Sequence, residues 1–439
     1  MMGVTSERLT EAEPADTAPR SMGRISFASF VGTAIEYYDF YIYGTAAALV
    51  FPHVFFPNMS PTMATIASFG TFAAAFFSRP LGAAVFGHFG DRLGRKKTLI
   101  ATLLIMGLST TCVGLVPGAD AIGLAAPLLL LTLRLLQGFA VGGEWAGAAL
   151  LSAEYAPAGK RGTYGMFTQL GVGFGLLLSN LVFLTVNLTV GEKSPAFIAW
   201  GWRAPFLFSA VLIAVALYVR LSLDETPVFK REMAAGSMAR VPIADLLRQQ
   251  PRQTLLGAGA MTGIFTFSFM AGTYFMGYAS TQLKHPRDLI LAVGVLGAVA
   301  MLLLTAVSAR LSDQYGRRAV VLVGFCLALP WSFTVVPLLD TGSQALFALA
   351  IMGTFALLGV SYGPMASFIP EVFATRFRYT GAGLAFNLGG ILGGAMPPVV
   401  AGALLAEYGS WSIGLMMAIL ILISLLSTAA LPETKAKAL

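Results

Sequence analysis

Long apolar runs separated by short polar interruptions dominate this chain of 439 residues. A helix that crosses a bilayer needs about 20 consecutive, mainly apolar residues, and twelve runs reach that length. They lie at about 27–50, 64–89, 98–117, 121–147, 164–189, 203–222, 253–279, 288–309, 318–338, 343–369, 379–406 and 411–431. The pattern predicts an all-α integral membrane protein with twelve transmembrane helices.

A longer polar connection divides the twelve runs into two sets of six. The expected parts are an N-terminal tail at 1–26, a first six-helix bundle at 27–222, a central connection at 223–252, a second six-helix bundle at 253–431 and a short tail at 432–439. The first 26 residues mix acidic and basic side chains, unlike the apolar core of a cleavable signal peptide. We therefore expect the first run to remain as a membrane helix.

Composition and charge agree with a membrane protein. Only 11% of the residues are charged and 56% are hydrophobic, whereas soluble domains carry about 25% charged residues. Most lysines and arginines fall in the termini, the central connection and the loops that follow even-numbered helices. Because basic loops stay in the cytoplasm, we expect a multi-pass protein of the cytoplasmic membrane with both termini cytoplasmic.

Several other classes of protein find no support in the sequence. Cys112 and Cys326 lie inside apolar runs, and no metal-ligand spacing, phosphate-binding loop, basic nucleic-acid patch or nucleophile-base arrangement stands out. We expect no enzymatic activity, no metal, no cofactor and no nucleic-acid partner. The expected surroundings are the lipid bilayer, with the protein as a monomer.

Three matched junctions show that the two halves are repeats. The stretch Gly87–Lys97 (GHFGDRLGRKK) recurs in degraded form as Ala309–Ala319 (ARLSDQYGRRA). A Glu and an Arg seven residues apart follow the fourth and the tenth run, and LDETPVF after the sixth run resembles LPETK after the twelfth. Parallel repeats of this kind are the pattern of major facilitator transporters, whose substrate site lies near the membrane midplane between the halves.

The matched polar residues are best interpreted as a cytoplasmic gate. An Asp at a helix end can pair with the Arg four residues later and face the positive N-terminus of a helix from the other half. The gate candidates are Asp91, Arg95, Glu154, Arg161, Asp313, Arg317, Glu371 and Arg378. The alternative is that these charges only determine topology.

Four motifs carry a family resemblance. The sequences GTAIEYYDFYIYG (Gly32–Gly44), SRPLGA (Ser78–Ala83), RLLQGFAVGGEW (Arg134–Trp145) and LDETPVF resemble those of the metabolite/proton symporter family of the major facilitator superfamily. The resemblance implies two pseudo-symmetric six-helix bundles and uptake driven by a proton gradient. Relatives carry shikimate, 2-oxoglutarate, citrate, other carboxylates, proline or betaine.

Buried charges in the first half are the candidates for proton coupling, because charged groups inside a bilayer are costly. Glu36, Asp39 and Tyr43 share one face of the first helix. Asp39 and Arg134 both fall about halfway through their helices, so we expect them to pair. Asp39 is the preferred proton carrier and Glu36 the second choice. The alternative is a fixed ion network of Glu36, Asp39 and Arg134 that only holds the bundle together.

Arg79 and Arg134 are the candidate contacts for an anionic substrate, because a guanidinium binds a carboxylate through two parallel hydrogen bonds. Alternatively, Arg79 partners Glu144 or caps backbone groups freed near Pro80. The remaining substrate-binding candidates, each also explicable as packing, are Tyr43, Gln137, Glu144, Gln169, Asn180, Tyr274, Tyr362 and Asn387.

The sequence therefore predicts a secondary transporter that imports a small polar metabolite with protons by alternating access. The expected substrate is an organic acid similar to shikimate or a dicarboxylate. Three alternatives remain open: a carrier of a zwitterion such as proline or betaine, a substrate sensor that does not transport, and a proton-driven exporter.

Overall fold

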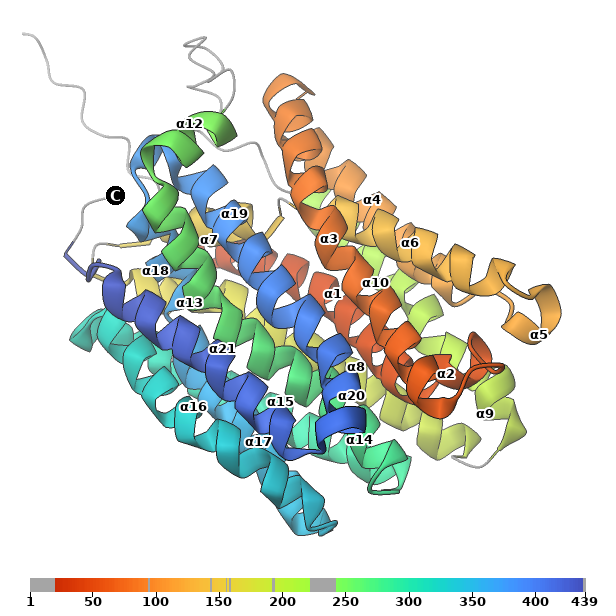
Figure 1. The fold of residues 1–439 in the computed structure, drawn as a ribbon. Helices are drawn as coiled ribbons and strands as arrows, with labels where there is room; N and C mark the ends of the chain where they lie inside the picture. The colour runs from red at the N-terminus through yellow and green to blue at the C-terminus, as the bar shows by residue number, and fades with distance from the viewer. Residues whose placement is uncertain are drawn as a thin grey trace, which may run out of the picture.

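Twelve long helical segments form the body of the molecule (Figure 1). The computed structural model describes residues 20–436 except 94, 143, 155, 158, 192–193 and 222–241, and it leaves out some side chains near these gaps. The first six segments are α1 (Arg20–Leu49), α3 (Pro61–Leu93), α4 (Arg95–Val113), α6 (Ala125–Val141) with α7 (Glu144–Glu154), α8 (Arg161–Val190) and α10 (Ala204–Leu221).

The second six segments repeat this arrangement. They are α13 (Pro251–Phe269) with the π-helix η2 (Met270–Tyr274) and α14 (Phe275–Thr281), α15 (Arg287–Tyr315), α16 (Arg317–Asp340), α17 (Gln344–Tyr362) with α18 (Met365–Val372), α19 (Arg378–Gly390) with the π-helix η4 (Ile391–Ala395) and α20 (Met396–Tyr408), and α21 (Trp411–Ala430).

Short elements connect the long segments. They are α2 (Phe51–Val54), α5 (Ala119–Ile122), α9 (Pro195–Ala199), η1 (Gly201–Arg203), α12 (Pro242–Gln249) and η3 (Thr375–Phe377). Within the described ranges, nine helical segments are long and apolar enough to cross a membrane. The other three of the twelve, α1, α3 and α4, coincide with the first three predicted runs.

Several helices extend beyond the apolar runs. The second run ends near residue 89 whereas α3 continues to Leu93, and the eighth ends near 309 whereas α15 continues to Tyr315. Hydropathy marks only the membrane-embedded part of a helix, so it underestimates helices that project from the bilayer. After α15 the chain turns at Gly316 alone, whose φ of 106° is a conformation that favours glycine.

The two halves lie side by side and touch at both ends (Figure 1). Helix α8 packs along α15, and α3 packs along α19, η4 and α20. We call the end with residues 87–97 and 309–319 the motif end; there α7 and α8 meet α18. At the opposite end α1 meets η2 and α14.

Candidate functional site

The carboxylate of Asp39 is held inside the first bundle. It is fully buried, and its two oxygens accept hydrogen bonds from Ser209 Oγ at 2.7 Å and from Thr110 Oγ1 at 2.9 Å. Gln137 Nε2 donates to the same Thr110 hydroxyl at 2.8 Å, and Arg134 Nη1 donates to Gln137 Oε1. A chain of hydrogen bonds therefore connects the buried Asp39 carboxylate to the buried Arg134 guanidinium.

The expected direct pairing of Asp39 with Arg134 is not seen among the described contacts. The reason is the packing of the helices. Helix α6, which carries Arg134, packs against α3 and α4, whereas α1 lies mainly against α8, α10 and α3. Thr110 of α4 and Gln137 of α6 therefore intervene between the two charges.

Aromatic rings surround the Arg134 guanidinium. Its central carbon lies 4.2 Å from the ring centroid of Tyr43, 4.3 Å from that of Phe40 and 5.0 Å from that of Phe72. The Tyr43 hydroxyl donates to Thr71 Oγ1 at 2.8 Å. A desolvated cation over an aromatic face gains about 2 kcal/mol, so the rings offset part of the cost of burying this charge. Tyr43 and Gln137 thus contact Arg134.

Arg79 lies in α3 and is 1% exposed. Its guanidinium carbon lies 4.2 Å from the Phe40 ring centroid and 4.7 Å from that of Phe76. Within the described part of the chain, none of its three guanidinium nitrogens makes a hydrogen bond of good geometry, although the Tyr37 hydroxyl and the Glu36 carboxylate lie near enough to interact with it. A buried charged donor without a well-placed acceptor is strongly unfavourable, so an anionic group placed here would stabilise the site.

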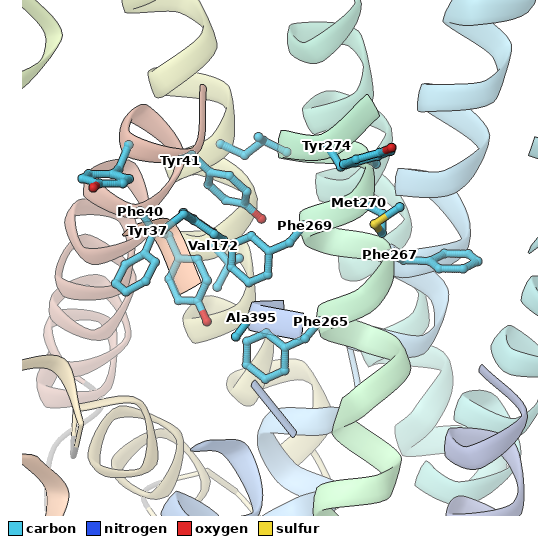
Figure 2. Packing of buried hydrophobic residues seen from close by; sticks show 14 of the residues in the cluster. Tyr37, Phe40, Tyr41, Val172, Phe265, Phe267, Phe269, Met270, Tyr274 and Ala395 are labelled. Carbon is cyan, nitrogen blue, oxygen red and sulfur yellow. The ribbon is translucent and has the colours of Figure 1, made fainter. Parts of the chain in front are cut away.

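A small void of about 10 Å³, roughly the space of one water molecule, lies between the halves. Arg79 interacts electrostatically with Tyr37 and Tyr362, which both line the void. Figure 2 shows Tyr37, Phe40 and Tyr41 of α1 close to Phe265 and Phe269 of α13. The lining residues are Tyr37 and Val172 from the first half and Ile264, Phe265, Ser268, Met301, Leu358 and Tyr362 from the second half.

Three of the predicted substrate contacts make hydrogen bonds within the protein. Gln169 Nε2 donates to the backbone oxygen of Tyr362 at 3.0 Å, and Asn387 Nδ2 donates to that of Gly142 at 2.8 Å, so both cross between the halves. Asn180 Nδ2 donates to Leu176 O of its own helix at 2.9 Å. These amides stabilise helix packing in this conformation.

The other predicted residues near the site are buried as well. Tyr274 lies in η2 with its ring centroid 5.9 Å from that of Phe69 across the interface. Glu36 is fully buried and interacts electrostatically with Arg79. Glu144, at the start of α7, is 7% exposed.

Asp313 joins the two halves at the motif end. Its carboxylate accepts hydrogen bonds from the backbone nitrogens of Gly162 and Thr163, both at 2.8 Å, and from Thr163 Oγ1 at 2.7 Å. Arg317 Nη2 pairs with the same carboxylate at 3.1 Å. An Asp of the second half thus occupies the positive N-terminus of α8 in the first half, where a negative charge is stabilised.

A second cluster surrounds the buried Glu371. Arg317 Nε lies 3.5 Å from its carboxylate, and Arg161 of the first half lies 3.8 Å from it. Thr434 Oγ1 donates to Glu371 Oε2 at 2.6 Å. Burial raises the pKa of Glu371, while the bond from Thr434 and the charges of Arg317 and Arg161 lower it by smaller amounts.

The LPETK segment (Leu431–Lys435) belongs to this closed end. Glu433 accepts hydrogen bonds from the backbone nitrogens of Arg317 at 2.9 Å and Arg318 at 3.1 Å, at the N-terminus of α16. Lys435 Nζ donates to Gln314 O at 2.6 Å. The repeat of this segment was visible in the sequence, but its contact with the gate was not predicted.

The first copy of the gate falls largely outside the described side chains, which do not include Asp91, Arg95 and Glu154. Arg378 is buried at the start of α19. The backbone places α3 beside α19.

Sequence reasoning missed four residues of the central site. Thr110 and Ser209 bind the Asp39 carboxylate, Tyr37 lines the void, and the Phe40 ring contacts two arginines. Hydroxyls and aromatic rings are common in membrane helices, so they carry no signal of their own. The aromatic positions adjoining Glu36 and Asp39 were the available hint.

The halves also meet at the end opposite the motif. Beside the central void, Tyr41 and Ser268 share a hydrogen bond of 2.6 Å between their hydroxyls, and further contacts lie beyond it. The Tyr274 ring packs against Phe69, and a side-chain carbon at Gly277 would lie 3.3 Å from Ala48. The two halves therefore contact each other on both sides of the central void.

Two six-helix bundles that meet around a small void, with the buried charges Asp39, Arg79 and Arg134 inside the first bundle, define a membrane transporter of the major facilitator fold. The chain belongs to the sugar (and other) transporter family, whose model matches residues 25–255 and 231–439.

Similar proteins include several bacterial transporters. The chain is 42% identical over 429 residues to the inner membrane metabolite transport protein YhjE of Escherichia coli K12, covering 96% of this chain and 97% of that protein. It is 38% identical over 396 residues to the shikimate transporter of the same strain, covering 88% and 89%. It is 34% identical over 387 residues to the proline/betaine transporter of that strain, covering 85% and 76%.

A solved structure shares the fold. The D-xylose-proton symporter matches with a TM-score of 0.73 at 20% sequence identity, covering 95% of this chain and 99% of that one. The predicted twelve-helix major facilitator fold and the family resemblance are confirmed. The relatives and the fold are those of transporters, not of enzymes.

Proposed function

We propose that this protein imports a small organic acid together with protons by alternating access. The observation that carries the proposal is Arg79, a buried guanidinium that makes no hydrogen bond of good geometry in the described structure, beside the void between the halves. A substrate carboxylate is the complement to that group, since it accepts two parallel hydrogen bonds from a guanidinium. The similarity to a shikimate transporter supports an acid of that size.

Asp39 is the proposed proton carrier. It is fully buried, and its partners Ser209 and Thr110 are neutral hydroxyls. A hydroxyl can donate to the ionised acid or accept from the protonated one, so the site accommodates both protonation states. Glu36 is the second candidate, and Arg134 is the basic partner connected through Gln137 and Thr110.

Alternating access requires that the closed motif end opens. Opening would break the bonds of Asp313 to the N-terminus of α8 and the pairing of Arg161 with Glu371, because these contacts join the two halves. Such contacts must remain weak enough for both states to be populated. We propose that the motif end and both termini lie in the cytoplasm. The protein would function as a monomer in the inner membrane, with the proton gradient as its energy source.

A zwitterionic solute is the second candidate. Tyr37, Phe265 and Tyr362 line the void, and aromatic faces attract quaternary ammonium groups. The similarity to a proline/betaine transporter agrees with such a substrate. In this case Arg79 would bind the carboxylate and the rings the ammonium group.

The test is uptake of labelled shikimate, 2-oxoglutarate, citrate, benzoate, proline and betaine into proteoliposomes, with and without an inward proton gradient. Accumulation of an acid that collapses with a protonophore is the expected result. Accumulation of proline or betaine would replace the organic acid with the zwitterion. Export under an outward gradient, or binding without flux in counterflow, would favour an exporter or a sensor.

A further inference from the structure

Phe40 contacts both of the buried guanidinium groups of Arg79 and Arg134. The central carbon of Arg79 lies 4.2 Å, and that of Arg134 4.3 Å, from the same ring centroid. Both cations therefore pack against the same aromatic ring. Phe40 is fully buried, and Figure 2 shows it beside Tyr37 on α1.

Each guanidinium belongs to a different site. Arg79 adjoins the void through Tyr37 and Tyr362, whereas Arg134 is connected to Asp39 through Gln137 and Thr110. Arg134 lies in the electrostatic field of both Arg79 and Asp39. The ring therefore stands where the proposed substrate site meets the proposed proton site.

We propose that Phe40 is the positioning residue that couples proton binding at Asp39 to anion binding at Arg79, an inference that rests on the function proposed above. The buried ring packs against both cations and excludes water from their surroundings, so their repulsion is weakly screened. Neither role requires Phe40 to touch the substrate.

The sign of the coupling follows from the charges. Ionised Asp39 compensates the charge of Arg134. When Asp39 takes up a proton, Arg134 and Arg79 repel each other without that compensation, and an anion at Arg79 relieves the repulsion. Protonation thus strengthens anion binding, and by reciprocity anion binding favours protonation. This is the sign that symport requires.

The other groups facing Asp39 leave this scheme intact. Glu36 and Tyr38 lie on its own helix and Arg134 on α6. Helices α4 and α10 contribute the hydroxyls of Thr110 and Ser209. Among these described neighbours, Arg134 is the cation.

The experiment compares Phe40→Leu with two matched variants. Phe72→Leu removes a ring that contacts Arg134 at 5.0 Å, and Phe76→Leu removes one that contacts Arg79 at 4.7 Å. Each control thus loses one cation contact, whereas Phe40→Leu loses both. Phe40→Tyr retains both ring faces and serves as the conservative variant.

The readout is the Kd of labelled shikimate, or of the panel acid that the wild type accumulates, at pH 6 and pH 8 in nanodiscs. We expect the wild-type Kd to differ by roughly tenfold or more between the two pH values, a typical coupling between two sites. Phe72→Leu, Phe76→Leu and Phe40→Tyr should keep that ratio even where affinity changes. In Phe40→Leu the ratio should fall below about threefold, while counterflow exchange persists.

Two results would overturn the inference alone. One is a monodisperse Phe40→Leu protein whose Kd depends on pH as strongly as that of the wild type. The other is an equal loss of this pH dependence in Phe72→Leu and Phe76→Leu, which would indicate a general packing effect. A wild type with neither a pH-dependent Kd nor proton-driven accumulation would instead refute the proposed symport, and this inference with it.

Discussion

Replacing Asp313 with Ala tests whether the motif end is a gate. The side chain makes three hydrogen bonds to residues 162 and 163 of the other half, and it is 10% exposed. A hydrogen bond to a charged group contributes about 1.5–3 kcal/mol. Because the open state hydrates the same groups, we count only two bonds at the lower limit, about 3 kcal/mol. This corresponds to a roughly hundredfold shift toward the open state.

The assay is maleimide labelling of a cysteine that only an open motif end exposes. Ala366 is fully buried, and a side-chain carbon at Gly165 of the other half would lie 3.4 Å from its Cβ. An Ala366→Cys reporter, with the exposed Cys112 and Cys326 replaced by Ala, should therefore label slowly. Adding Asp313→Ala should accelerate labelling by at least tenfold, a conservative fraction of the expected shift.

Asp340→Ala is the matched control. Asp340 also accepts hydrogen bonds, from Tyr278 and Ser410, but these lie at the opposite end and within the second half. Removing them should leave reporter labelling unchanged. If Asp313→Ala labels no faster than Asp340→Ala while both remain monodisperse, Asp313 does not hold the gate closed.

Three further predictions concern the central site and the second gate cluster. Asp39→Asn should retain counterflow exchange but lose accumulation against a gradient; loss of binding in a folded variant would instead assign Asp39 to the substrate site or the scaffold. Arg79→Gln should weaken binding of an acid substrate by roughly 10–100-fold, since a hydrogen bond to a charged group contributes about 1.5–3 kcal/mol; unchanged affinity in a binding assay would refute Arg79 as the anion contact. Burial raises the pKa of Glu371, which lies beyond the predicted membrane run, so the closed gate is favoured at low pH and loses this contribution as pH rises through the raised pKa. Thr434→Val removes a hydrogen bond that lowers the pKa of Glu371, so this pKa should rise further. The pH at which labelling of the reporter cysteine increases, measured relative to labelling of an exposed cysteine, should therefore move upward. A downward shift of that pH would contradict this role of Thr434.

The sequence was most informative about features that the lipid bilayer dictates, namely the apolar helices and the few charged residues within them. Twelve apolar runs predicted twelve helices because a bilayer requires continuous apolar segments. Asp39, Arg79 and Arg134 were identifiable because charged residues are rare in such segments, and the structure places all three deep in the first bundle. The gate residues were identifiable because they occur twice.

The arrangement of the charges was not predictable from their positions in helices. Depth alone suggested that Asp39 would pair with Arg134, but the packing of α6 inserts Thr110 and Gln137 between them. Phe40 has no polar group, so its contact with two cations depends on three helices whose relative rotation one sequence does not specify. The LPETK segment was recognised as a repeat, but its partners lie more than 60 residues away along the chain.

The attachment of the LPETK segment also constrains how the protein is made. Glu433 caps the start of α16, which lies 116 residues earlier in the chain, and Thr434 binds Glu371. During synthesis, α16 and the gate glutamate leave the ribosome well before these partners exist. The motif end therefore cannot reach its described form until residues 433 and 434 have been synthesised. Until then, a nascent chain would lack the bonds from this segment to α16 and to Glu371.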